Sequence, residues 1–177
     1  MKSSGKMILG YVVGGVFVII LIPSIIYLAT TLIDDIYKIE IFQDRTLKWS
    51  VAAVLLIVGL AFGISSIIYQ NVIGKGGPLE ISNIEISPKT KYLVVSGPYR
   101  FTRNPMLFGT LLIYFAIALM INSITAVILL VLFAVVMLTV VVKKEEERLL
   151  KDFGDQYREY RERTSLIMPW FPKRDNK

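Results

Sequence analysis

Long unbroken apolar blocks alternate with charged segments along the chain, and the lengths of these blocks predict membrane-spanning helices. The first block runs from Met7 to Ile33 and the second from Trp49 to about Tyr69, and neither contains a charged residue. A helix needs about 20 apolar residues to cross the ~30 Å hydrocarbon core of a bilayer. We therefore predict one retained transmembrane helix over each block, the first of them kinked at Pro23.

The third apolar block covers residues 105–142 and is 38 residues long. A single helix of that length would extend roughly 57 Å, at 1.5 Å per residue, which is far more than one crossing requires. Asn122 and Ser123 form the only adjacent polar pair inside the block. We therefore predict a tight turn at this pair and two packed helices, over about 105–121 and 124–142.

These blocks predict an all-α membrane protein with about four transmembrane helices. Residues 1–70 are expected to form two N-terminal transmembrane helices. Residues 71–177 are expected to form a second unit, made of a polar loop, the 105–142 hairpin and C-terminal helices outside the membrane. The oligomeric state stays open, because the only small-xxx-small pattern that we identify, Gly10/Gly14, is a weak signal.

Charge is distributed unevenly between the polar segments that separate the apolar blocks. The N-terminus carries Lys2 and Lys6 and no acid, and residues 71–104 carry five basic and two acidic side chains. The tail from Lys143 carries ten basic and eight acidic side chains. Residues 34–48 carry three basic and four acidic side chains. Because basic loops stay on the cytoplasmic side of a membrane, we predict a multi-pass protein with both termini in the cytoplasm.

Composition narrows the classes of function. Apolar residues make up 54% of the chain and charged residues 19%, against about a quarter charged in soluble domains. The chain has no cysteine and no histidine, which excludes disulfides, thiolate sites and a Ser-His-Asp triad, and we expect no bound metal.

No predicted span contains an ionisable Asp, Glu, Lys or Arg, which argues against ion-coupled transport. The net charge of +6 suits anionic headgroups, so we expect a membrane and no nucleic acid as partner.

Polar residues gather in two segments at the predicted cytoplasmic face, and the first is Lys91–Met106. Its Tyr92–Val95 run favours an extended conformation. Ser96-Gly97-Pro98 is typical of a turn, because glycine adopts a positive φ easily and proline fixes its own φ.

The same segment ends in a predicted helix start. Asn104 is the expected N-cap, and Pro105 suits the first helical position, where the missing N–H has no partner to lose. Arg100 and Arg103 lie beside this helix start. They are either anchors at the level of the headgroups or ligands of an anionic group, which the helix N-terminus would also favour.

The second segment, Lys143–Arg163, combines acids with an apolar stripe. Phe153-Gly154-Asp155 predicts a helix stop and a second short helix that folds back. The acids Glu145–Glu147 form either a solvated turn of ion pairs or a binding site for a cationic ligand group. The closing Thr164–Pro172 stretch is predicted to be an interfacial anchor, with Trp170 at headgroup depth. The stripe consists of apolar residues that recur every three or four positions: Leu149, Leu150, Phe153, Tyr157 and Tyr160.

Together, the two segments resemble the integral-membrane methyltransferases that include isoprenylcysteine carboxyl methyltransferase and the phospholipid (phosphatidylethanolamine) methyltransferases. That family shows G-x-Y-x-x-x-R-[HN]-P-M before a helical hairpin and E-E-x-x-L-x-x-x-F-G-x-x-Y-x-x-Y after it. The first stretch is matched here by residues 97–106, from Gly97 to Met106, and the second by residues 145–160. The resemblance covers about residues 88–172, roughly half of the chain.

The resemblance implies S-adenosylmethionine as methyl donor, held in a cytoplasmic pocket formed by residues 88–104 and the C-terminal tail. It implies catalytic roles for Arg103, Tyr99 and Asn104. Arg103 would orient an anionic group, and Tyr99 would form a wall of the site or act as a proton partner. Glu146 is the leading candidate for a cofactor ligand. The cofactor-binding residues that it implies are Leu93, Val94, Val95, Gly97, Tyr99, Asn104, Pro105, Met106, Glu145 and Glu146.

Two positions depart from the family pattern, and the methyl acceptor is left open. Asn104 stands where histidine is usual, so any role of histidine is lost, and Leu107 replaces a frequent aromatic residue. Three acceptors are compatible with the sequence: an isoprenyl-type carboxylate, an aminophospholipid, or a small thiol or amine that partitions into the membrane. The alternative function is a non-catalytic membrane scaffold or assembly subunit that has kept the fold.

Overall fold

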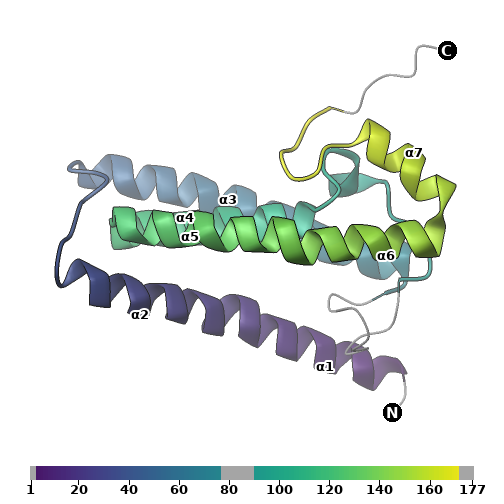
Figure 1. Cartoon of the computed structure of the whole chain (residues 1–177), viewed down its shortest axis with the longest axis horizontal. Helices are drawn as coiled ribbons and strands as arrows, with labels where there is room; N and C mark the ends of the chain where they lie inside the picture. The colour runs from purple at the N-terminus through teal and green to yellow at the C-terminus, as the bar shows by residue number, and fades with distance from the viewer. Residues whose placement is uncertain (1–2, 77–89, 172–177) are drawn as a thin grey trace.

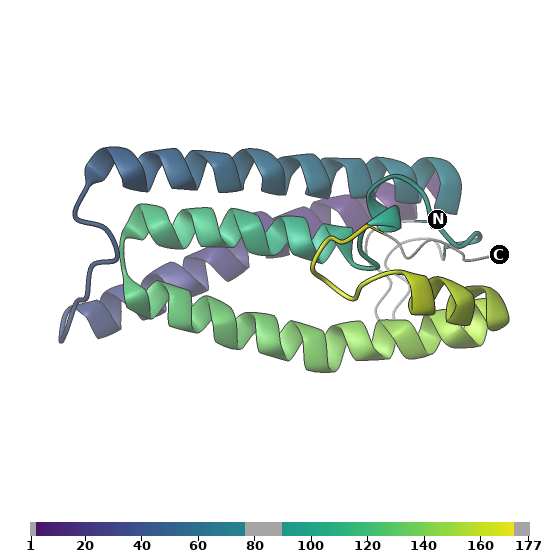
Figure 2. The ribbon, with the colours of Figure 1, turned by 90° about the horizontal axis from the view of Figure 1, so that it is seen from above.

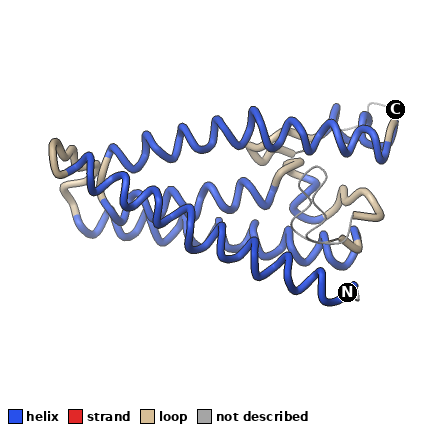
Figure 3. Tube along the Cα trace, turned by 60° about the horizontal axis from the view of Figure 1, so that its bottom comes forward, coloured by secondary structure: helices blue, strands red, loops and turns tan. Residues whose placement is uncertain are grey.

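A computed structural model describes residues 3–76 and 90–171 of the chain, which form a bundle of helices (Figure 1). Within these residues the structure contains helices and loops (Figure 3). Its one β-type contact there is an isolated parallel bridge between Thr102 and Ser165. The predicted all-α class is confirmed. In chain order the elements are α1 (Ser3–Gly15), η1 (Val16–Leu21), α2 (Ile22–Asp34), α3 (Arg45–Tyr69), η2 (Gln70–Gly74), η3 (Gly97–Arg100), α4 (Pro105–Ile121), α5 (Ile124–Val136), η4 (Met137–Val142), α6 (Lys143–Phe153) and α7 (Asp155–Arg163).

Three helical stretches are long and apolar enough to cross a membrane: Gly10–Asp34, Arg45–Gly74 and Ile124–Phe153. Their side chains are mostly exposed, with 6%, 17% and 11% of the most apolar window buried, as expected for surfaces that face lipid. These three helices indicate a membrane protein. α4 is apolar but has 17 residues, which gives a length of about 26 Å at 1.5 Å per residue.

The first long helix passes Pro23 without a break, through the wide π-helical turn η1. The N–H of Ile22 donates to the carbonyl of Phe17, so in the same register a residue at position 23 would donate to Val18. Proline has no N–H to give. The Tyr114 hydroxyl on α4 instead donates to the Val18 carbonyl at 2.6 Å. The predicted kink site, Pro23, therefore follows directly after a π-helical turn. The free carbonyl of that turn accepts from a neighbouring helix, as membrane helices require.

The predicted turn at Asn122-Ser123 is confirmed. α4 ends where Asn122 adopts a left-handed conformation with φ of 60°, and the Ser123 hydroxyl caps α5 by accepting from the Thr125 N–H at 3.1 Å. Asn122 also exchanges two hydrogen bonds with the backbone of Phe42, at 2.9 and 3.0 Å. The Ser123 hydroxyl donates to Asp34 at 2.9 Å. These contacts join the 35–44 loop to the hairpin, at the end of the bundle opposite α7 (Figure 1).

α3 and α4 lie side by side (Figure 2) and approach closely through glycines that the sequence analysis did not single out. A Cβ on Gly59 would lie 2.8 Å from the Gly109 carbonyl oxygen, and a Cβ on Gly109 would lie 2.6 Å from the Gly59 carbonyl oxygen. Gly59 and Gly63 form a small-xxx-small pair, so the expectation that Gly10/Gly14 is the only such pattern was wrong. Small residues let two helix backbones come together where hydrophobic burial cannot drive association.

A pair of alanine substitutions tests this close approach. Gly109→Ala should lower stability by about 1–3 kcal/mol, because the new methyl group overlaps backbone atoms that cannot rotate away. Gly63→Ala is the matched control, since nothing lies within 4 Å of its Cβ position. Thermal unfolding in detergent would measure both. Equal melting temperatures for the two variants would contradict the packing described here.

The C-terminal part of the bundle brings α7 back over the beginning of α4. α5, η4 and α6 form one continuous helix that ends at Phe153, and Gly154 turns the chain with φ of 54°. The predicted helix stop and fold-back are confirmed. The sequence Phe153-Gly154-Asp155 also suggested Asp155 as the N-cap of the second helix, but Gly154 holds that position and Asp155 is the first helical residue. Residues 164–171, here called the strap, then cross from α7 toward η3 and the start of α4 (Figure 2).

Candidate functional site

A groove of about 400 Å³ lies between the chain segment that leads into η3 and the helix α7. The segment supplies apolar side chains and one guanidinium group, and α7 and its last turn supply polar side chains and the ring of a tyrosine. Within the α7 wall, Arg163 pairs with Glu159 at 2.5 Å. The lining residues are Leu93, Val95, Arg100, Gln156, Glu159, Tyr160, Arg163 and Thr164.

Residues 90–100 are held against the end of α3 and η2. The carbonyl of Gly74 accepts hydrogen bonds from the N–H groups of Lys91 and Tyr92, at 2.8 and 3.3 Å. Val94 is buried at 6% exposure, so it anchors this segment while its neighbours on either side line the groove. Tyr92 lies at a bend and residues 93–95 are not helical, and the extended conformation of Tyr92–Val95 stays a prediction.

The turn at Gly97 has the conformation that the sequence predicts. Gly97 adopts φ of 61°, and an added Cβ would lie 2.4 Å from ring atoms of Tyr69. Both conditions favour glycine: the left-handed backbone disfavours L side chains, and the tyrosine ring occupies the space that a side chain would need. η3 starts at this residue and carries Tyr99 and Arg100.

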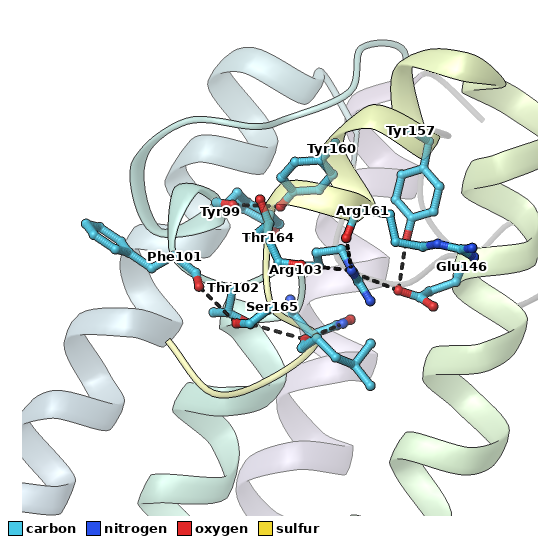
Figure 4. Close-up of polar contacts among 12 residues, drawn as sticks. Tyr99, Phe101, Thr102, Arg103, Glu146, Tyr157, Tyr160, Arg161, Thr164 and Ser165 are labelled. Atoms are coloured by element: carbon cyan, nitrogen blue, oxygen red, sulfur yellow. Dashed lines mark hydrogen bonds and ion pairs between the residues drawn. The ribbon is translucent and has the colours of Figure 1, made fainter. Parts of the chain in front are cut away.

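α7 is fixed to the rest of the site by its two buried tyrosines. The Tyr160 hydroxyl donates to the Tyr99 carbonyl at 2.7 Å, and the Tyr157 hydroxyl donates to Glu146 at 3.0 Å (Figure 4). Burial, above all, raises the pKa of both hydroxyls, and for Tyr157 the Glu146 carboxylate adds to the effect. Both tyrosines therefore remain protonated donors at neutral pH.

Arg103 connects the helix start of α4 to the end of α7 (Figure 4). Its Nη1 donates to the carbonyl of Arg161 in the last turn of α7, at 2.6 Å, and to the carbonyl of Thr164 just after it, at 2.8 Å. The last carbonyls of a helix have no partner within the helix, so Arg103 supplies a donor there. Its Nε lies 2.8 Å from Glu146 Oε1 as an ion pair, although the N–H does not point at an acceptor. Only 12% of the Arg103 side chain and 19% of the Glu146 side chain are exposed, so water screens this pair little.

Asn104 holds the N-cap position of α4, but its side chain does not cap the helix, and that part of the prediction was wrong. The side-chain amide instead donates to the Leu166 carbonyl of the strap at 2.9 Å. The Thr102 hydroxyl donates to the same carbonyl at 3.2 Å. The strap offers a backbone acceptor directly beside the helix start, and this contact takes the amide away from the helix.

The strap forms further backbone contacts with the end of η3. Arg103 N–H donates to the Ser165 carbonyl, and Trp170 N–H donates to the Phe101 carbonyl, both at 2.9 Å. The rings of Phe101 and Phe171 meet edge to face, 5.8 Å apart. Trp170 and Phe171 are 74% and 78% exposed, and their role as an interfacial anchor stays a prediction.

The three consecutive acids of α6 have different surroundings. Glu145 pairs with Arg148 at 2.5 Å, and Arg148 also reaches Asp152 at 3.3 Å. Glu146 turns toward Arg103 and Tyr157, whereas Glu147 is exposed. Glu145 therefore belongs to an ion-pair network along the helix, and Glu146 belongs to the contacts that hold α7.

Tyr99 points away from the groove, toward η2. Its hydroxyl lies 3.5 Å from Gln70 Oε1, at the long limit of a hydrogen bond. Burial, then the charge of Glu145 and then Tyr11 raise the pKa of the Tyr99 hydroxyl. Tyr99 is thus a neutral hydrogen-bond donor at neutral pH, with its backbone beside the groove and its hydroxyl on the opposite side.

The structure divides the predicted site residues into two groups. Leu93 and Val95 line the groove. The others do not line the groove. Val94, Gly97 and Pro105 pack behind it, and Met106 lies in the first turn of α4. The remaining residues make the hydrogen bonds and ion pairs described above: Tyr99, Arg103, Asn104, Glu145 and Glu146. Residues 88–89 of the predicted pocket segment lie outside the described residues.

The sequence analysis did not single out the polar wall of α7. Gln156, Glu159 and Arg163 line the groove, and they lie between or after the tyrosines that the apolar stripe identified. Positions 156, 159 and 163 share one helical face at i, i+3 and i+7. This helical spacing is the sequence signal that could have identified them. Tyr157 and Tyr160 are buried, and the polar face formed by 156, 159 and 163 lies toward the segment across the groove.

Together, these features define a helical membrane protein with a groove at the end of the bundle where α7 lies. The sequence profile of the phospholipid methyltransferase family matches residues 47–156, from the first turn of α3 to the start of α7. The chain belongs to the phospholipid methyltransferase family. No curated protein and no solved structure matches the chain.

Proposed function

We propose that this protein transfers a methyl group from S-adenosylmethionine to a lipidic or membrane-partitioning acceptor at the cytoplasmic face of a membrane. The observation that carries the proposal is the family match over residues 47–156, because it includes Gly97–Met106 and most of the 145–160 stretch. The groove between residues 93–100 and α7 supports it, since it lies between these two stretches.

The groove has the size and the donor set that the cofactor requires. Its volume of about 400 Å³ falls within the ~300–1,000 Å³ typical of small-molecule sites. Leu93, Val95 and the Tyr160 ring offer an apolar surface for a purine, and Glu159 offers a carboxylate for ribose hydroxyls or an amino group. Arg100 offers a guanidinium for a carboxylate.

When bound, S-adenosylmethionine supplies a methyl group on a positively charged sulfur, which is already activated for displacement. The protein's contribution is then to orient the acceptor, the methyl group and the sulfur, and to exclude water. No histidine is required for this, because an ionised carboxylate or thiolate needs no base, and an amine loses its proton to solvent. Tyr99, as a neutral donor, is proposed to orient the acceptor.

Three residues are proposed to keep the parts of the site in position: Arg103, Glu146 and Asn104. Arg103 and Glu146 hold α7 against the start of α4, and Asn104 holds the strap. Glu145, Pro105 and Met106 remain proposed cofactor-binding residues, on the family resemblance. In this proposal, the catalytic core is residues 71–177, and residues 1–70 supply two membrane helices.

The proposed topology has four spans, with α4 as the shortest and both termini in the cytoplasm. α4 is enclosed by the other helices, and about 26 Å of helix suits a slightly thinner part of the bilayer. The basic excess of residues 71–104 and of both termini supports a cytoplasmic location of α7 and the groove in this proposal. No observation favours the alternative of a non-catalytic scaffold.

Cofactor binding separates these two functions. We expect the purified protein in detergent to bind S-adenosylmethionine in isothermal titration calorimetry, and Glu146→Ala to weaken binding by about tenfold or more. The reason is that Arg103 and Tyr157 lose their shared partner and α7 loosens. Glu147→Ala, an exposed neighbour on the same turn, should bind like the wild type. Absence of binding by the wild-type protein would favour the scaffold.

A further inference from the structure

The strap lies where the apolar lengths of two bundle helices meet a common boundary. α4 runs about 26 Å from Pro105 to the turn at Asn122, and α5 with η4 runs 19 residues, about 28 Å, from that turn to Val142. Lys143 and Lys144 follow directly. Both lengths match the ~30 Å hydrocarbon core of a bilayer. The start of α4, to which the strap is hydrogen-bonded, therefore lies at a membrane boundary (Figure 2).

One side chain of the strap reaches past this boundary into the bundle. Ile167 packs against the apolar cluster of Leu111, Tyr114 and Leu130, which joins α4 to α5. These residues lie beyond the first turn of α4 and in the middle of α5. The strap therefore dips into the layer that the apolar side chains of the bundle occupy, and its chain then returns toward η3.

Two carbonyls of the strap receive hydrogen bonds from the residues that precede α4. The Leu166 carbonyl accepts from both the Asn104 amide, at 2.9 Å, and the Thr102 hydroxyl, at 3.2 Å. The Ser165 carbonyl accepts from the Arg103 N–H at 2.9 Å. A carbonyl that faces water needs no protein donor, whereas a carbonyl at the edge of the hydrocarbon layer must find one inside the protein.

The second half of the strap is satisfied in the same way. The Met168 carbonyl accepts from the Ser165 hydroxyl, and the Trp170 N–H donates to the Phe101 carbonyl at 2.9 Å. Pro169 has no N–H to satisfy. The backbone of the strap is thus prepared for a surrounding that supplies little water.

The outward side chains of the strap are large and apolar. Met168, Trp170 and Phe171 are 67%, 74% and 78% exposed, and residues 164–171 contain no charged side chain, although α7 directly before them is strongly charged. An exposed apolar patch of this kind marks a contact surface. Its place at the boundary of the bundle identifies the contact as lipid, because tryptophan is enriched at that depth.

We propose that the strap is a re-entrant element that inserts into the bilayer leaflet on the side of α7, with Ile167 as its deepest residue and Trp170 at headgroup depth. Asn104 and Thr102 then have a defined task, which is to satisfy the Leu166 carbonyl where water is scarce. The inference concerns the membrane contact of the strap and does not rest on methyl transfer.

Tryptophan fluorescence tests the depth of the strap. The chain has two tryptophans, so Trp49→Phe leaves Trp170 alone. In phosphatidylcholine vesicles, lipid brominated near the headgroup end of its chains should remove about half or more of the Trp170 fluorescence. Lipid brominated near the chain ends and aqueous iodide should each remove much less. Arg158→Trp, made after both natural tryptophans are replaced by phenylalanine, is the reference, because this position on α7 is 64% exposed, and it should respond mainly to iodide.

The donors to the Leu166 carbonyl provide a second test in the same background. Thr102→Val combined with Asn104→Leu removes both donors, so the strap should lift and iodide quenching of Trp170 should rise about twofold or more. Thr102→Ser keeps a hydroxyl and should match the parent protein. Quenching of Trp170 by iodide as strong as in the Arg158→Trp reference, without quenching by brominated lipid, would overturn the inference. Unchanged quenching in the double variant would do the same. Methyl transfer enters neither measurement, so a failure of the proposed function is seen separately.

Discussion

Gly97→Ala should reduce methyl transfer by about a hundredfold or more. Gly97 adopts φ of 61°, and the new Cβ would lie 2.4 Å from the Tyr69 ring. The Tyr69 ring lies against Gly97 at the start of η3, so the added methyl group should displace the backbone of η3, and with it the groove wall and Tyr99. A displacement of about 1 Å at a site that works by alignment can cost about 10²-fold in rate. Initial rates of transfer at saturating cofactor measure the effect.

Gly154→Ala separates backbone strain from the clash with Tyr69. Gly154 also has a positive φ, of 54°, but nothing lies within 4 Å of its Cβ position. This variant should show only the strain of an alanine at φ of 54° and ψ of −123°, about 1–3 kcal/mol, as a lower melting temperature. Gly97→Ala must lose far more activity than Gly154→Ala. Similar losses in both variants would mean that the contact with Tyr69 has no special importance.

Arg103→Ala should release α7 and the strap from the start of α4. The substitution leaves Glu146 without its cation in a position that is 19% exposed, and it removes the donor to two carbonyls at the end of α7. Removing one member of a buried ion pair typically costs about 3–5 kcal/mol. We expect cofactor binding to fall below detection and α7 to become sensitive to limited proteolysis, while the long helices stay folded.

Two other substitutions define what Arg103 contributes. Arg103→Lys keeps the charge near Glu146 but cannot reach the same carbonyls with a planar fork, so it should recover only part of the binding. Arg158→Ala removes an arginine of α7 that is 64% exposed and pairs only with Asp155 among the described residues, and it should have little effect. A proteolysis pattern of Arg103→Ala that equals the wild-type pattern would rule out the clamping role.

The helices and their connections could be predicted because each has a local signal. The lengths of the apolar blocks predict the long helices. The Asn122-Ser123 pair and Gly154 predict turns, and in the structure Asn122 and Gly154 have a positive φ. Gly97 belongs to the same group, since its positive φ follows from the turn sequence. Local patterns of this kind do not depend on which segment lies next to them.

The features that the sequence did not predict depend on partners from distant segments. The side chain of Asn104 leaves the helix start because the Leu166 carbonyl of the strap lies beside it. Gly59 meets Gly109 only because α3 and α4 pack together. Each requires a pairing of elements that a hydropathy pattern does not specify.

The central claim is that this member of the phospholipid methyltransferase family is an active methyltransferase with a membrane acceptor. Membranes that contain the protein are incubated with S-adenosylmethionine labelled in its methyl group, beside membranes with Glu146→Ala at matched expression. The account predicts label in the organic phase above that control, in a product that chromatography can identify. Wild-type membranes with no more label than the control in any fraction, and no cofactor binding by the purified protein, would contradict it.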